Sequence, residues 1–164
     1  ETVLALWTDH VLKWGPLRTG YAYAFMGFVA VIVQGLAVGP LVRILGEGRA
    51  VACGAAVVLL GAMLVPTAGS AVGLYVALGL ITGGVCVSGP TLTSLVSHYA
   101  GEDERGAILG LSQSSAGFGR ILGPAFSGLV FAGLGPNWPF LCGALVMVLM
   151  LVLSLRLIRR GNRP

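Results

Sequence analysis

Arg120 is a permanently charged residue in a stretch of otherwise apolar and small residues, GFGRILGPAFSG at positions 117–128. An arginine at the centre of a membrane helix costs about 2.5 to 3.5 kcal/mol, less where its guanidinium meets water, an acid or free carbonyls. Pro124 has no N–H to donate to the Arg120 carbonyl, so acceptors become available nearby. We expect Arg120 to face protein or water, and snorkelling to the membrane surface is the alternative.

Further polar side chains are candidates for binding a molecule within the membrane. Gln113 lies on the same helical face as Arg120, and Gln34 occupies a comparable stretch near the start of the chain. Thr82, Cys86 and Thr93 follow helical spacing and form a stripe along a third apolar stretch, residues 72–97. This stripe should face either a neighbouring helix or an aqueous cavity, and packing alone remains the alternative to binding.

Enzymatic chemistry would need a nucleophile beside a base, or a cluster of metal ligands. Neither pattern is present, because His10 and His98 are expected in loops on opposite sides and no Asp or Glu falls inside a complete apolar span. Cys53, Cys86 and Cys142 read as small apolar residues of the spans. We therefore predict no catalytic residue, no metal site and no cofactor.

The elements that must position these residues are membrane helices. The chain has 164 residues, of which 56% are hydrophobic and 10% charged, and about 20 apolar residues cross a bilayer as a helix. Its runs are apolar on most sides, unlike the alternating strands of a barrel. The sequence predicts an all-α, polytopic bundle with five complete spans, preceded by the end of a sixth helix. The spans lie near 21–42, 50–66, 72–97, 106–134 and 138–155. The uncharged stretch Ala50–Ser97 is too long for one crossing but suits two, with PTAGS at Pro66–Ser70 as the turn between them.

Small residues on these spans predict close helix packing. Ser112, Ala116, Gly119, Gly123 and Ser127 share one helical face of the fourth span. The pattern G-x-x-x-G-P occurs at Gly35–Pro40 and again at Gly119–Pro124, as expected for an inverted repeat. The residues predicted to serve packing or gating are Gly35, Gly39, Pro40, Gly89, Pro90, Gly119, Gly123 and Pro124.

Basic residues in short loops collect on the cytoplasmic side of a membrane. Seven arginines fall on one predicted face, against Lys13 and Arg18 on the other: Arg43, Arg49, Arg105, Arg156, Arg159, Arg160 and Arg163. The C-terminus is therefore expected in the cytoplasm. Trp14 and Trp138 are expected as interface anchors. The net charge of +4 follows from this bias, so the lipid bilayer and not nucleic acid is the predicted partner.

Several motifs, in this order and spacing, give the chain a family resemblance. They are WGPLRTG, QGLAVGPLVRILGEGR, SGPTLTSLVSH, GEDERGAILGLSQS and RILGPAFSG. Together they resemble the C-terminal half of a major facilitator superfamily transporter, most like the drug:proton antiporter and tetracycline-efflux branch. The resemblance implies that residues 1–164 are a six-helix half of a twelve-helix fold, with the N-terminal half absent from this fragment.

The resemblance also implies a function. It suggests proton-coupled efflux of small amphipathic drugs by alternating access in a bacterial inner membrane. No complete span holds an acidic residue, so the carboxylate that carries protons would sit in the missing half. Uptake or exchange of a small metabolite by the same fold is the nearest alternative, and a non-transporting assembly partner is another.

The family's cytoplasmic loop motif predicts a charge latch at helix ends. Here GPLVRILGEGR has Arg43 where the motif often has an acid, so the latch is incomplete. Glu47 and Arg49 remain as ion-pairing partners. Glu104 and Arg105 either cap the fourth span, where a carboxylate stabilises the helix by about 0.3 to 1 kcal/mol, or latch the partner half.

Overall fold

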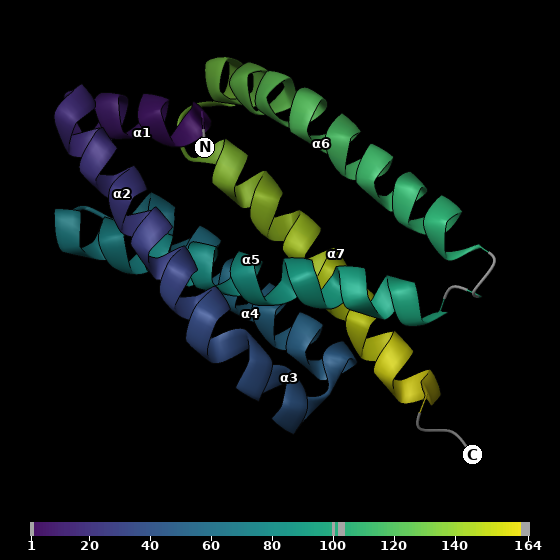
Figure 1. Cartoon of the computed structure of the whole chain (residues 1–164). Helices are drawn as coiled ribbons and strands as arrows, with labels where there is room; N and C mark the ends of the chain where they lie inside the picture. The colour runs from purple at the N-terminus through teal and green to yellow at the C-terminus, as the bar shows by residue number, and fades with distance from the viewer. Residues whose placement is uncertain (1, 100, 102–103, 162–164) are drawn as a thin grey trace.

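The computed structural model describes residues 2–99, 101 and 104–161. Within them the chain forms helices joined by short turns, and five helical rods are long and apolar enough to cross a membrane. Figure 1 shows these rods gathered in one bundle, with the rod that contains α2 and α3 (Pro16–Leu45) crossing α5 (Ala71–Tyr99). Each predicted span is therefore a helix, and the expected all-α bundle is confirmed for the described residues.

The first part of the chain contains a short helix and one long rod. Helix α1 covers Thr2–Leu12. The rod runs from Pro16 to Leu45 as α2 (Pro16–Ile32), a π-helical segment (Val33–Ala37) and α3 (Val38–Leu45). Gly15 precedes Pro16 at the first helical position, where the missing N–H of proline costs nothing. At the far end Gly46 adopts φ +77°, which lies outside the helical range and ends the rod. Residues with a side chain rarely adopt this conformation, so glycine suits the position.

Four further α-helices and one 3₁₀ turn follow in the described chain. They are α4 (Glu47–Leu64), continued by a 3₁₀ turn (Val65–Thr67), then α5 (Ala71–Tyr99), α6 (Arg105–Leu134) and α7 (Trp138–Gly161). Pro66 lies in the 3₁₀ turn between α4 and α5, where the sequence predicted a turn. Gly135, at φ +108°, ends α6. The predicted span 106–134 differs from α6 by one residue at its start. The first rod begins at Pro16 and α7 ends at Gly161, both beyond the predicted bounds, because an apolar pattern does not fix helix ends.

Helices α4 and α5 form the tightest pair in the described chain, and glycines make this contact possible. A Cβ built on Gly54 would lie 2.8 Å from the carbonyl oxygen of Gly84, and one on Gly84 would lie 2.5 Å from that of Gly54. Gly61 similarly faces the Ala77 carbonyl at 2.8 Å. Small residues thus let two backbones touch. The sequence analysis did not name Gly54 or Gly61 for this role.

Helix α6 lies at the surface of the bundle, and none of its residues is buried. In Figure 1 it runs along one side of the bundle, apart from α4. Its far end meets α1, where the rings of His10 and Phe131 pack edge to face with centroids 6.1 Å apart. The polar and small faces of α6 are therefore open along most of its length.

One buried apolar cluster includes a tryptophan that the sequence analysis placed at the membrane interface. Trp14 is only 7% exposed and belongs to the same buried cluster as Leu74 and Ala77. Lys13 turns the chain with φ +54°, and the Trp14 N–H donates to the Thr8 carbonyl at 3.1 Å. The anchor prediction is wrong for Trp14 because this turn folds the indole inward. Trp138, at 48% exposure, lies on the surface.

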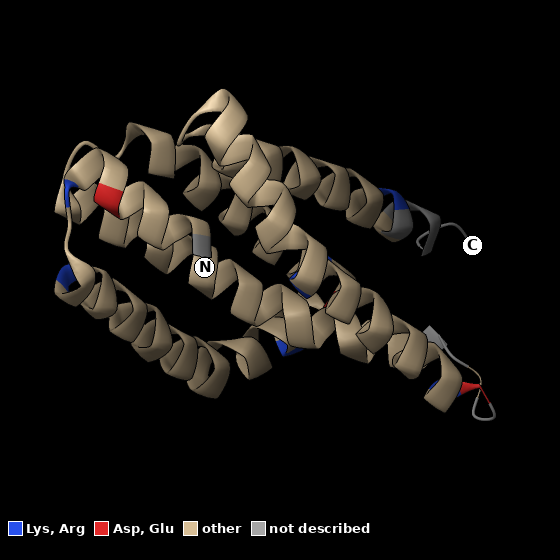
Figure 2. Ribbon diagram, turned by 90° about the horizontal axis from the view of Figure 1, so that it is seen from above, with Lys and Arg blue, Asp and Glu red and all other residues tan. Residues whose placement is uncertain are grey.

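Charged residues lie mainly toward the ends of the rods. Figure 2 shows long ribbons without charge, with most acidic and basic positions near helix ends. Glu47 begins α4 and contacts Ser94 and His98 near the end of α5, so the junction of α3 and α4 at Gly46 and the end of α5 lie at the same end of the bundle. Arg163, which contributed to the predicted orientation, lies outside the described residues.

Candidate functional site

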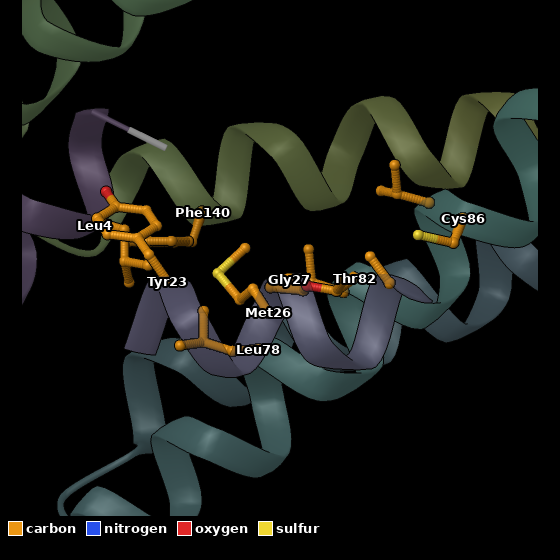
Figure 3. A pocket seen from close by; sticks show the side chains of 11 residues that line it. Leu4, Tyr23, Met26, Gly27, Leu78, Thr82, Cys86 and Phe140 are labelled. Carbon is orange, nitrogen blue, oxygen red and sulfur yellow. The ribbon is translucent and has the colours of Figure 1, made fainter. Parts of the chain in front are cut away.

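A cavity of about 520 Å³ opens between α1, α2, α5 and the start of α7. Figure 3 shows side chains from these helices directed toward one another around it. Its walls carry two aromatic rings, Tyr23 and Phe140, together with Met26 from α2. Among the described residues none that lines it is Asp, Glu, Lys, Arg or His. The space suits an apolar molecule of drug size, since such pockets hold about 300 to 1,000 Å³.

Two of the predicted polar residues reach this cavity. Thr82 and Cys86 lie one turn apart on α5 and both line it. The Thr82 hydroxyl is buried and has no hydrogen-bond partner within the described chain. Burying a hydroxyl without a partner costs roughly 1 to 3 kcal/mol by mutational measures, so this group is an exception that needs a reason.

Gln34 joins α2 and α5 at the π-helical segment. Its side-chain nitrogen Nε2 donates to Cys86 Sγ over 3.4 Å. A π-helical turn holds an extra residue, shifts the side chains that follow and occurs often at functional sites. The structure thus brings Gln34 and Cys86 together beside the cavity, which sequence spacing alone did not indicate.

The remaining polar candidates stay apart from the cavity. Arg120 and Gln113 are exposed on α6, and Arg120 makes no hydrogen bond or ion pair with any residue that the structure describes. α6 continues through Pro124. Thr93 is exposed and donates to the Gly89 carbonyl of its own helix at 3.2 Å. Only Thr82, Cys86 and Gln34 of the predicted set therefore meet.

The glycines predicted to pack have open space in this chain. No atom lies within 4 Å of a Cβ built on Gly35, Gly39, Gly89, Gly119 or Gly123. Pro40 lies in α3, while Pro90 and Pro124 lie inside helices that continue past them. The two G-x-x-x-G-P copies also differ, because Gly35 lies in the π-helical segment and Gly119 in an α-helix. Their packing role therefore stays a prediction about a neighbour beyond this chain.

The predicted latch has a different partner from the one expected. The Ser94 hydroxyl donates to Glu47 Oε1 at 2.6 Å, and His98 Nδ1 lies 3.0 Å from Glu47 Oε2. His98 belongs to the last turn of α5 and not to a loop. Arg43 and Arg49 are exposed, and within the described residues neither is paired with Glu47. The sequence analysis therefore missed Ser94 and His98, which become neighbours of Glu47 only through α4–α5 packing.

The second half of the latch also lies at this end of the bundle. Arg105 Nε donates to the Ser97 carbonyl at 3.3 Å, linking the start of α6 to the end of α5. Glu104 occupies the N-cap position of α6 without a side-chain capping bond. Its predicted place at the helix start is correct, while a latch to a partner half stays a prediction.

Comparison with known proteins agrees with this architecture. Residues 2–164 match the Major Facilitator Superfamily. Multidrug resistance protein 2 of Bacillus subtilis is 31% identical over 159 residues, covering 94% of this chain and 38% of that protein. The class C tetracycline resistance protein of Escherichia coli is 26% identical, covering 96% and 40% respectively. For the class G protein of Vibrio anguillarum the identity is 29%, with coverage of 90% and 39%.

No solved structure matches the chain significantly. The chain spans about two fifths of the length of the curated relatives, 38% and 40% for the first two. The superfamily consists of membrane transporters and not enzymes, in agreement with apolar rods that surround an uncharged cavity. The matched range and the five membrane-spanning rods together place this chain in the major facilitator superfamily.

Proposed function

We propose that this chain is the C-terminal half of a twelve-helix transporter that exports small amphipathic drugs. The observation that carries the proposal is the apolar, uncharged cavity of about 520 Å³ in a chain 31% identical to a protein named for multidrug resistance. Apolar walls with few polar groups accept many solutes, because they impose little directional bonding. The coverage of 38% of that relative supports a missing N-terminal half.

The uncovered helix α6 supports the same arrangement. None of its residues is buried, and Gly119 and Gly123 have open space around them. We place this helix against the N-terminal half, where Arg120 would find water or an acidic partner. Alternating access would then be a rocking of the two halves about the site between them.

Proton coupling and orientation complete the proposal. A titrating carboxylate within the membrane would come from the N-terminal half, since the complete spans that the sequence predicted contain none. The C-terminus and the end that holds Glu47 and Arg105 would face the cytoplasm of a bacterial cell. Fusion of a fluorescent protein or of alkaline phosphatase to the C-terminus tests the orientation, because the first is active inside the cell and the second outside.

Transport is tested with the full-length protein in proteoliposomes. Ethidium movement is followed by fluorescence with an imposed pH gradient, and then with the gradient collapsed by a protonophore. Saturable movement that requires the gradient supports drug:proton antiport. Gradient-driven accumulation of a nutrient without ethidium movement would favour uptake, and absence of any solute movement would favour a non-transporting assembly partner.

A further inference from the structure

The Thr82 hydroxyl differs from the other hydroxyls of α5. Ser88 donates to the Gly84 carbonyl at 2.8 Å and Thr91 to the Val87 carbonyl at 2.6 Å, each four residues back along the helix. This bond is the usual way for a hydroxyl inside a membrane helix to be satisfied. Thr82 is 9% exposed, yet its Oγ1 lacks such a bond among the described residues. A partner of Thr82 therefore has to come from the cavity that it lines.

The polar side chain one helical turn farther along α5 already has a hydrogen-bond partner. Cys86 lies one turn after Thr82 and accepts the bond from Gln34. Thr82 consequently offers a hydrogen bond at a position where the surrounding wall, including Leu78 and Ile81, is apolar. A hydrogen bond formed in such surroundings is stronger than one in water.

Room for a ligand beside Thr82 comes from Gly27 on α2. Gly27 lines the cavity, and a Cβ built on it would meet no atom within 4 Å. Figure 3 shows Gly27 and Thr82 close together along the wall, with Met26 and Leu78 nearby and the Phe140 ring farther along. Here a side chain would occupy space that is now open.

We propose that this cavity binds an uncharged aromatic ligand, or the uncharged aromatic part of a larger one, through a single hydrogen bond to Thr82. The inference rests on the proposed drug transport and specifies the substrate class at its C-terminal wall. Tyr23 and Phe140 supply aromatic surface for ring packing. A charged group would be desolvated there without a countercharge, which costs several kcal/mol, so any cationic group of a substrate lies outside this cavity.

The test measures binding of tritiated chloramphenicol, an uncharged aromatic probe, to the detergent-purified full-length protein by equilibrium dialysis. Thr82→Val keeps the side-chain shape and removes the hydroxyl, and is expected to weaken binding about three- to tenfold, as for one net hydrogen bond. Thr82→Ser keeps the hydroxyl and is expected to bind within about twofold of the wild type. Gly27→Leu fills the cavity and should abolish saturable binding.

Gly143→Leu is the matched control, since Gly143 lies on an exposed face of α7 with no atom near its built Cβ and does not line the cavity. Gel filtration and helical circular dichroism check that each variant folds. Wild-type affinity in Thr82→Val or in Gly27→Leu, or no saturable binding by the wild type, would overturn the inference.

Ethidium export separates this inference from the proposed function. Wild-type protein that exports ethidium but does not bind chloramphenicol contradicts the site and leaves drug export standing. Protein that binds chloramphenicol in a Thr82-dependent manner but moves neither compound supports the site and contradicts drug export.

Discussion

The indole nitrogen of Trp7 donates a hydrogen bond of 2.9 Å to Oδ1 of Asn137, joining residues 130 positions apart. Trp7 is fully buried and meets the Phe140 ring edge to face, with centroids 6.1 Å apart. This contact ties α1 to the turn between α6 and α7. Because Phe140 lines the cavity, the same contact fixes one of its walls.

Replacement of Trp7 should destabilise the protein in two steps. Trp7→Phe keeps a ring but removes the donor to Asn137, and should lower the free energy of unfolding by about 1 kcal/mol. Trp7→Ala also removes the buried ring, with an expected loss of about 3 to 5 kcal/mol. Denaturant titration in detergent measures both. Trp138→Phe is the control because Trp138 is exposed, and an equal loss in that variant would contradict the role of Trp7.

Replacement by alanine should change the free energy of unfolding in different directions at two glycines with different surroundings. In Gly84→Ala the new Cβ meets the Gly54 carbonyl and Val58, so overpacking should cost about 1 to 3 kcal/mol in unfolding free energy. Gly123 has open space, so Gly123→Ala should be neutral or stabilising by up to about 1 kcal/mol in this chain. Thermal unfolding of both variants in detergent checks the order, and similar melting temperatures would contradict glycine-mediated packing of α4 and α5.

The coupling free energy between Glu47 and Ser94 should be larger than that between Glu47 and His98. The Ser94 hydroxyl bonds the carboxylate at 2.6 Å, and Ser94→Ala should lower stability by about 1.5 kcal/mol, as for a bond to a charged acceptor. The His98 side chain is 68% exposed, so its coupling to Glu47 should be about 0.2 to 1 kcal/mol. Double-mutant cycles with Glu47→Gln measure both couplings.

Arg120 should affect transport and leave folding unchanged. Its side chain is exposed and contacts no described partner in this chain, so Arg120→Ala should melt like the wild type. In the full-length protein the same change should slow ethidium export about tenfold, equivalent to roughly 1.4 kcal/mol, with Arg120→Lys intermediate. Arg156→Ala is the control at matched expression. Equal export by wild type, Arg120→Lys and Arg120→Ala would favour snorkelling.

The sequence by itself determined the helices and their number among the described residues. Apolar length between charges is a local property, so Ala50–Ser97 had to contain two crossings, and Pro66 marked the turn between them. The family could also be predicted from the sequence, because the ordered motifs run through nearly the whole chain. The match to the family covers residues 2–164.

Only the tertiary structure decided which faces touch. The spans are apolar on most sides, so pattern does not distinguish a glycine with open space beside it in this chain, such as Gly123, from one in contact, such as Gly84. The same limit hid the pairing of Glu47 with His98 and the burial of Trp14. Such contacts depend on the register between helices distant in sequence, and register is fixed when backbones and side chains fit together in three dimensions. For that reason only the packed structure showed that the buried Thr82 hydroxyl lacks a hydrogen-bond partner among the described residues.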